Sequence, residues 1–306
     1  MNATDHPDGA RAIVAALAAN VGIAAAKFAG FLITGSAAMM AESVHSVADI
    51  ANQGLLLLGQ NFARKRADTL HSFGYGRSRY FWSFVVALMI FMLGAVFALY
   101  EGCYKVAHPE PLTSPVVALA ILIVAAGLES YSFYTARTES RSLKGSKSWW
   151  RFIRDSRNPE LPVVLLEDTA DLIGLALAIA GVGLTVLTGS SVWDGVATLA
   201  IGVLLGAVAV FLMVEMHSLL IGESATASET EDIREALEST EYVDRLIHLR
   251  TQYLGPDELL VAAKVSVAPG VDLATVASAI DAAEVKIRTA VPAARIIYIE
   301  PDIDRA

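Results

Sequence analysis

The sequence has 306 residues, 55% of them hydrophobic, and a formal net charge of −9. The acidic balance argues against nucleic-acid binding, which needs a basic surface. The single cysteine, Cys103, excludes an intramolecular disulfide and a zinc cluster built from cysteines. The short polar tail before the first apolar block lacks a basic segment and a small-residue cleavage site, so we expect no signal peptide.

The hydrophobic residues are gathered into six blocks, each near or above the roughly 20 residues that cross about 30 Å of hydrocarbon. Blocks such as residues 85–99 and 192–214 have almost no polar stripe at helical period, unlike the buried helices of a soluble protein. We therefore expect six membrane spans, at about residues 12–33, 37–60, 81–101, 116–136, 162–188 and 192–216.

Lys and Arg gather in the connections between spans two and three and between spans four and five. The other connections have only Lys105 close by. The positive-inside rule then places both basic loops and both termini in the cytoplasm of a multi-pass membrane protein. The Ala-, Val- and Gly-rich chain favours a bacterial inner (plasma) membrane over an organelle.

Spans one and four each carry an isolated charge. Lys27 in span one either extends its stem to the interface or pairs within the bundle. Glu129 in span four either lines a cavity open to the cytoplasm or lies at the membrane interface. Both alternatives stay open from the residues alone.

Two pairs of polar residues are spaced four apart within apolar spans. His45 and Asp49 share one face of span two, and Glu167 and Asp171 share one face of span five. A carboxylate at mid-membrane costs about 2.5–3.5 kcal/mol, so such residues mark ion pathways. Two neighbouring carboxylates repel each other unless a proton or a metal cation lies between them.

The depths of the two pairs agree. At about 1.5 Å per residue, His45 lies about 13 Å and Asp49 about 19 Å below the outer end of span two. Glu167 lies about 7 Å and Asp171 about 13 Å above the inner end of span five. In a slab about 30 Å thick the pairs overlap, so we predict one divalent-cation site. Asp168 points about 100° away and is an alternative or outer ligand.

Taken singly, these residues have plainer interpretations. His45 fits a helix-packing histidine, and Glu167 and Asp168 fit acids favoured by a helix N-terminus. The two pairs at matched depth favour the metal site.

Three motifs in order resemble the cation diffusion facilitators: H-S-V-A-D at 45–49, H-S-F-G-Y-G-R-S-R-Y at 71–80, and E-x-x-x-D at 167–171. The string V-L-L-E-D-T-A at 164–170 is similar to a zinc-transporter-like branch that includes a mitochondrial zinc transporter. The resemblance implies a proton-coupled exporter of divalent metal with a metallochaperone-like cytoplasmic domain.

The family's transport site maps onto His45, Asp49, Glu167 and Asp171. Glu167 departs from the histidine that is usual at its position, which makes the ligand set harder. Zn²⁺ is the expected substrate, with Mn²⁺, Fe²⁺ or Co²⁺ as alternatives.

The resemblance also implies sites in the loop between spans two and three. Asp68 and His71 match part of a second metal site, although Tyr75 stands where another histidine is expected. Arg77 matches the basic residue of a dimer charge interlock, and Glu223 lies near the position of its acidic partner.

After about residue 220 the composition changes to that of a small domain, residues 221–306. Ser228 and Glu231 have capping-box spacing, and the turn G-P-D separates two strand-like runs. The order αββαβ predicts a two-layer domain with antiparallel strands and both helices on one face. The expected elements are residues 228–239, 243–253, 258–267, 272–290 and 295–300.

In the resembled family this domain dimerises and often binds regulatory metal through histidines. Here His248 matches one such position, but Lys264 and Tyr298 stand at two others, and Glu300 is the other oxygen ligand available. We therefore expect a homodimerisation module without its own metal site.

The expected fold class is an all-α six-helix transmembrane domain, residues 1–220, followed by a small α+β cytoplasmic domain. The expected function is proton-coupled efflux of a divalent metal ion across the lipid bilayer, with no enzymatic activity and no prosthetic group. An intramembrane metalloprotease would need a motif such as H-E-x-x-H, which the sequence lacks. A cation channel and a proton-coupled exporter of organic cations remain as alternatives.

Overall fold

The computed structural model describes residues 7–145 and 148–302. The chain divides into two compact units. The first, the helical unit, comprises Met1–Leu58, Trp82–Phe152 and Glu160–Val214. The second, the C-terminal unit, comprises Gly59–Phe81, Ile153–Pro159 and Glu215–Ala306.

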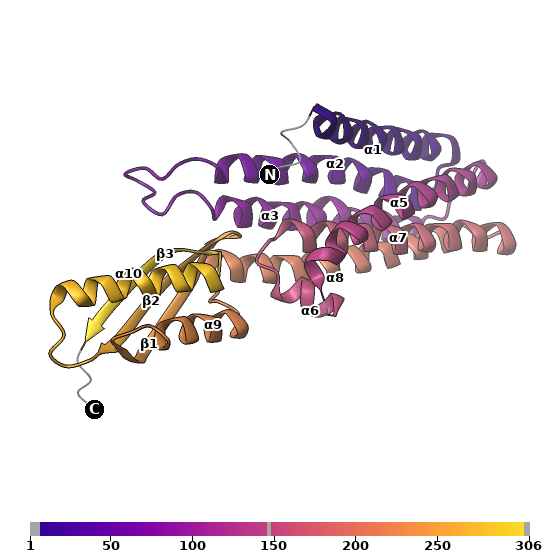
Figure 1. Cartoon of the computed structure of the whole chain (residues 1–306). Coiled ribbons are helices and arrows are strands. Elements are labelled where there is room, and N and C mark those ends of the chain that lie inside the picture. The colour runs from indigo at the N-terminus through magenta and orange to yellow at the C-terminus, as the bar shows by residue number, and fades with distance from the viewer. Residues whose placement is uncertain (1–6, 146–147, 303–306) are drawn as a thin grey trace. The chain divides into compact units, whose positions relative to one another are not determined.

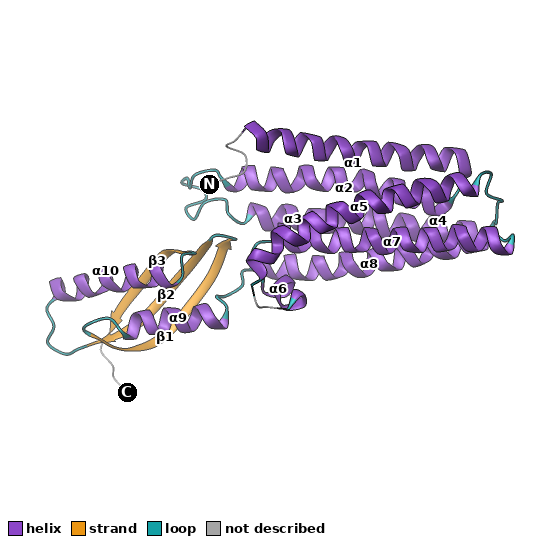
Figure 2. Ribbon diagram, turned by 45° about the vertical axis from the view of Figure 1, so that its right-hand side comes forward, coloured by secondary structure: helices purple, strands orange, loops and turns teal. Residues whose placement is uncertain are grey.

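Long helices make up the helical unit (Figures 1 and 2). The helix α3, the π-helical segment η2 and the helix α4 follow one another without a break and form a single span, Ser78–Ala107. A short helix, α6 (Trp149–Asp155), precedes α7. The elements other than α6 are α1 (Pro7–Thr34), α2 (Ala37–Ala63), α3 (Ser78–Met89), η2 (Ile90–Val96), α4 (Phe97–Ala107), α5 (Pro115–Lys144), α7 (Glu160–Thr188) and α8 (Val192–Ile221).

Four segments of the described chain are long and apolar enough to cross a membrane: Ser78–Ala107, Pro115–Thr135, Pro162–Thr188 and Val192–Ile221. The described apolar part of α1, Asn20–Thr34, is shorter. α2 is less apolar because polar residues, Glu42 and Asp49 among them, interrupt it.

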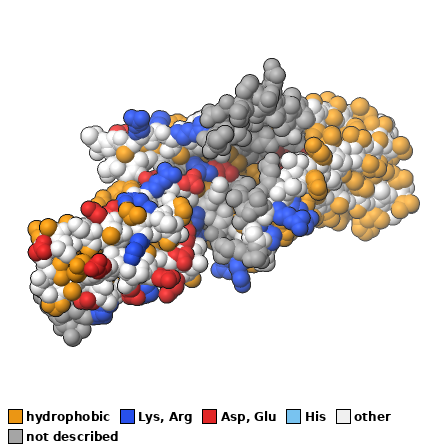
Figure 3. All heavy atoms as spheres, in the orientation of Figure 1, with side chains coloured by type: hydrophobic (Ala, Val, Ile, Leu, Met, Phe, Trp, Pro, Cys, Tyr) orange, Lys and Arg blue, Asp and Glu red, His pale blue; other side chains and the backbone are white. Residues whose placement is uncertain are grey.

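On the face shown in Figure 3, large apolar side chains cover the described surface of the helical unit at the right of the view. Leu32, Val116, Leu187, Val203 and Val214 are each more than 60% exposed. Soluble monomers rarely present contiguous apolar surface of this kind, whereas lipid tails favour it. The chain is therefore a membrane protein.

A carboxylate from α8 caps the N-terminus of α2. α1 and α2 are joined by a tight turn at Gly35, whose φ is +64°. The carboxylate of Asp194 accepts hydrogen bonds from Ser36 Oγ at 2.6 Å and from the backbone N–H of Ala37 at 2.7 Å. Lys105 Nζ donates to the carbonyl oxygen of Gly35 at 3.0 Å. Because these bonds satisfy groups that a helix end leaves unpaired, they hold α2 at a fixed depth.

The C-terminal unit has the expected element order αββαβ. β1 and β2 pair antiparallel, but β2 and β3 pair parallel. The expectation of an all-antiparallel sheet was wrong because α10 carries the chain back across the sheet before β3 begins. The helices α9 and α10 pack against each other. The elements are α9 (Ala227–Glu238), β1 (Val243–Gly255), β2 (Glu258–Val267), α10 (Leu273–Ala290) and β3 (Ala294–Asp302).

The capping box of α9 lies two residues earlier than the spacing of Ser228 and Glu231 predicted. Thr226 is the N-cap, and its backbone N–H donates to Glu229 Oε2 at 2.8 Å. The Tyr253 hydroxyl of β1 donates to Glu229 Oε1 at 2.6 Å. This contact favours the capping box of Thr226 and Glu229 over that of Ser228 and Glu231. Burial alone would raise the pKa of Glu229, but the hydrogen bonds from Tyr253 and Thr226 hold that pKa below its ordinary value.

Candidate metal centre

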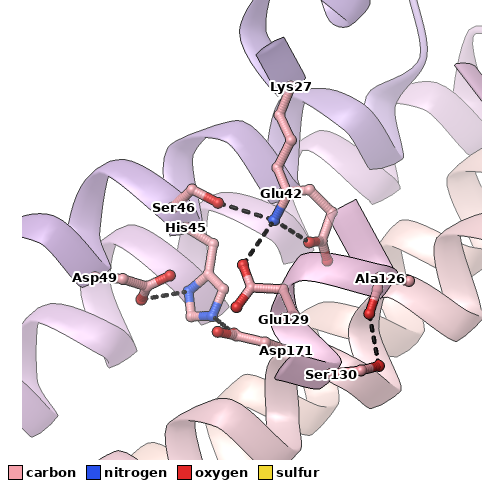
Figure 4. A network of polar contacts seen from close by, with 9 residues as sticks. All are labelled: Lys27, Glu42, His45, Ser46, Asp49, Ala126, Glu129, Ser130 and Asp171. Carbon is pink, nitrogen blue, oxygen red and sulfur yellow. Dashed lines mark hydrogen bonds and ion pairs between the residues drawn. The ribbon is translucent and has the colours of Figure 1, made fainter. Parts of the chain in front are cut away.

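His45 of α2 lies between two carboxylates (Figure 4). Its Nε2 contacts Oδ1 of Asp171 from α7, and its Nδ1 lies 3.7 Å from Oδ1 of Asp49, one turn further along α2. The imidazole is only 2% exposed. The helical period therefore sets both α2 residues on one face, and packing brings that face to α7.

The ligand atoms of these three side chains lie close enough together to share one metal ion. One ligand atom from each of His45, Asp49 and Asp171 lies within 4.8 Å of the others. An ion equidistant from three such atoms is within about 2.8 Å of each, compared with the roughly 2.0–2.2 Å of zinc bonds to nitrogen or carboxylate oxygen. A contraction of less than about 1 Å would complete these bonds.

Two of these atoms lack other partners. His45 Nδ1 and Asp49 Oδ1 are buried and have no hydrogen-bond partner within the described part of the chain. Buried polar atoms are almost always satisfied, so an unpaired pair facing each other needs an explanation. With the hydrogen on Nε2, His45 donates to Asp171 and turns the Nδ1 lone pair toward Asp49. A cation between them would satisfy both atoms.

Glu167 lies beside this cluster. It is buried in α7, one turn before Asp171, and its Oε1 accepts a hydrogen bond from Asn52 Nδ2 at 2.7 Å. The structure thus gathers three of the four predicted ligands and pairs the fourth with an amide. Its role as a ligand stays a prediction. Asn52 lies three residues after Asp49 on the same helical face, a spacing from which its position was predictable.

A small polar cavity adjoins the cluster between α1, α2, α5 and α7. Its volume is about 40 Å³, enough for about two water molecules. Asp168 and Glu129 line it together with three of the predicted ligands, Asp49, Glu167 and Asp171, so Glu129 faces a cavity. The cavity is lined by Asn20, Ile23, Ser46, Asp49, Gln53, Glu129, Ser132, Val164, Glu167, Asp168 and Asp171.

The π-helical segment η2 approaches the centre from the third span. A Cβ atom on Gly94 would lie 3.6 Å from His45 Nδ1 and 3.1 Å from Leu205 Cδ1. Glycine therefore lets the backbone pack directly against the imidazole. π-helical segments are often found at functional sites. The apolar composition of this span offered no signal of such a contact.

Asp68 and His71 lie in the exposed loop between α2 and α3. The Asp68 carboxylate accepts hydrogen bonds from the Tyr75 hydroxyl at 2.7 Å and from the backbone N–H groups of His71 and Leu70. The hydrogen bond from Tyr75 and those from the backbone hold the pKa of Asp68 below its ordinary value. Asp68 thus organises the loop, and its role in a second metal site stays a prediction.

Residues expected at the dimer and regulatory sites have other contacts. Glu223 forms an ion pair with Arg157, whose guanidinium lies over the Tyr253 ring. Lys264 Nζ lies 3.0 Å from a carboxylate oxygen of Glu300. In the described residues, His248 belongs to no cluster with metal-ligand geometry.

Comparison with known proteins identifies a family model and several proteins that are similar to this chain. Residues 13–221 match the cation efflux transmembrane domain. The chain is 34% identical over 241 residues to "Proton-coupled zinc antiporter SLC30A9, mitochondrial" of Mus musculus, covering 78% of this chain and 42% of that protein. It is 31% identical over 261 residues to "Metal tolerance protein C4" of Arabidopsis thaliana, covering 83% and 56%. It is 22% identical over 272 residues to "Magnetosome protein MamB" of Magnetospirillum gryphiswaldense, covering 88% and 85%.

The chain spans less than half the length of the mouse relative and just over half that of the plant relative. The matched domain takes in every residue of the centre, from His45 on α2 to Asp171 on α7. Since the match also covers more than half of the sequence, the chain belongs to the cation efflux family of transporters.

Proposed function

We propose that this protein exports Zn²⁺ in exchange for protons, and that the ion binds between His45, Asp49 and Asp171 with Glu167 as a fourth ligand. The observation that carries the proposal is the buried cluster of one imidazole and two carboxylates with unpaired atoms facing each other. One nitrogen and several oxygens form a ligand set that zinc accepts. The names of the mouse and plant relatives support metal as the substrate.

Competition between the metal and protons supplies the coupling. A histidine binds metal only as neutral imidazole, and its ordinary pKa lies near physiological pH. Protonation of His45 or of a neighbouring carboxylate from the outer side would therefore release the ion. Alternating access would require α2 and α7 to rock against the remaining helices, as in other transporters with a site at mid-membrane.

The same proposal includes the setting of the protein. Residues 1–220 would form the transmembrane domain, with residues 221–306 and the N-terminus in the cytoplasm of a bacterial cell. The basic connections between α2 and α3 and between α5 and α7 support this orientation. The C-terminal unit would hold two copies together as a homodimer.

Manganese, iron or cobalt is the second candidate substrate. The observation that favours it is the excess of oxygen ligands, with Glu167 in place of a second nitrogen. Harder oxygen ligands move preference from zinc toward manganese and related ions.

Purified protein in proteoliposomes tests the proposal. Uptake of Zn²⁺, Mn²⁺, Fe²⁺ and Co²⁺ would be measured with and without a pH gradient. We expect Zn²⁺ uptake that the gradient accelerates and that the double substitution of Asp49 and Asp171 by asparagine abolishes. Metal flux that does not depend on the pH gradient would indicate a cation channel. Gradient-driven uptake of organic cations, without uptake of metal, would indicate a proton-coupled exporter of organic cations. Full Zn²⁺ uptake by the double variant would refute the site.

A further inference from the structure

Lys27 of α1 is buried in the helical unit at 1% exposure. Its Nζ donates to Ser46 Oγ at 2.8 Å and to Glu42 Oε2 at 3.2 Å, both on α2. The same Nζ lies 3.8 Å from Glu129 Oε1 on α5. Figure 4 shows the ammonium pointing into the space between these three groups. One cation thus meets three oxygen ligands from two further helices.

The surrounding helices leave room for the oxygen atoms that contact Lys27. Glu42 is as buried as Lys27, and a Cβ atom on Gly174 of α7 would lie only 2.8 Å from Glu42 Oε1. Glycine at that position therefore makes room for the carboxylate between α2 and α7. Glu129 and Ser46 line the cavity that Asp49 and Asp171 also line. The oxygen-lined position therefore adjoins the metal centre through a shared cavity.

Stability alone does not explain this arrangement. Replacing a buried ion pair by well-packed apolar residues is often neutral or stabilising. Two carboxylates and a hydroxyl are instead the ligands that a hard divalent cation prefers. The ammonium of Lys27 occupies the point where such a cation would bind.

We propose that Lys27 is a specificity-determining residue, a tethered cation that denies the position formed by Glu42, Ser46 and Glu129 to the transported ion. The inference rests on the proposed metal export and goes beyond it. With Lys27 in place, the ion is held by the centre around His45 alone, which favours ions that accept nitrogen and allows release. Without it, the two freed carboxylates would hold divalent ions more tightly and would admit harder ones.

Isothermal titration of the full-length protein with Zn²⁺, Mn²⁺ and Mg²⁺ tests this inference, with uptake measured in proteoliposomes. For Lys27→Met we expect at least about tenfold tighter Zn²⁺ binding, because the substitution removes a positive charge beside the centre and frees two carboxylates. We also expect measurable Mg²⁺ binding and a lower maximal rate. Lys27→Arg should bind Zn²⁺ as the wild-type protein does, because arginine keeps the positive charge.

A triple variant, Lys27→Met with Glu42→Gln and Glu129→Gln, is the matched control. It removes both freed carboxylates and should bind Zn²⁺ no more tightly than the wild-type protein. If Lys27→Met does not fold, Glu42→Gln with Glu129→Gln in the presence of Lys27 serves instead. This variant should weaken Zn²⁺ binding at least about tenfold, since an unbalanced ammonium then repels the ion.

Wild-type Zn²⁺ affinity in Lys27→Met, or in the variant with Glu42→Gln and Glu129→Gln, would overturn the inference. Zn²⁺ binding tighter than wild type in the triple variant would overturn it as well. A merely structural role of Lys27 would weaken binding or lower protein yield, and would not tighten binding. Failure of the proposed function is distinguishable, because the wild-type protein would then neither bind nor transport Zn²⁺.

Discussion

Replacing Asp171 by asparagine removes one negative charge from the centre while keeping a ligand oxygen in place. Loss of one partner from a buried charge pair costs about 2–5 kcal/mol. The amide oxygen of asparagine still reaches the position of the ligand atom that Asp171 presents within 4.8 Å of those of His45 and Asp49. We therefore expect the lower part of the range, about 2–3 kcal/mol, or about 30- to 150-fold weaker Zn²⁺ binding.

The assay is titration of the purified protein with Zn²⁺, and Asp168→Asn is the matched control. Asp168 lies on the same helix and lines the same cavity, and the substitution changes the charge equally. Asp168 is outside the three-ligand cluster, so we expect its loss to weaken binding by at most about tenfold. Equal losses in the two variants would refute a localised centre, since they would mean that the overall charge of the cavity alone holds the ion.

Three further predictions concern elements that support the two units. Asp194→Ala leaves the first donors of α2 unpaired and should lower the stability of the helical unit by roughly 2–5 kcal/mol; an unchanged thermal midpoint in detergent would contradict the cap. Gly94→Leu should displace the imidazole of His45 and weaken Zn²⁺ binding more than Gly94→Ala does, because only the larger side chain cannot fit; the two variants would be compared by titration. Hydrogen bonds lower the folded-state pKa of Glu229 below 4.5, so its stabilising effect is present at neutral pH and is lost as the pH falls through that folded-state pKa. Glu229→Gln should therefore be less stable than wild type at pH 7 and equally stable at low pH, as measured by proteolysis of the C-terminal unit.

The element types follow from local patterns. In the described part of the chain, six apolar blocks predicted the six long helical segments of the helical unit. The strand-like runs after residue 240 predicted β1, β2 and β3 to within two residues of their ends. The direction of β3 was not predictable in this way. Strand pairing depends on where a crossover helix returns the chain, and the pattern of β3 itself is the same in either direction.

The candidate site likewise has a part that local patterns predict and a part that depends on how the helices pack. Helical period alone puts His45 with Asp49 and Glu167 with Asp171 on common faces, and the positions of the loops set their depth. The rotation of α7 about its axis is a packing property, and it brings Asp171 to the imidazole while Glu167 meets Asn52.

The sequence by itself therefore determined which helices carry the polar faces, because that information lies within one turn of each helix. Only the tertiary structure decided what each face meets. Lys27 had two possible environments until α2 and α5 supplied its partners. Gly94 had no role until the imidazole of a distant helix packed against it. Contacts between residues far apart in the chain depend on how whole helices pack, and no local pattern encodes them.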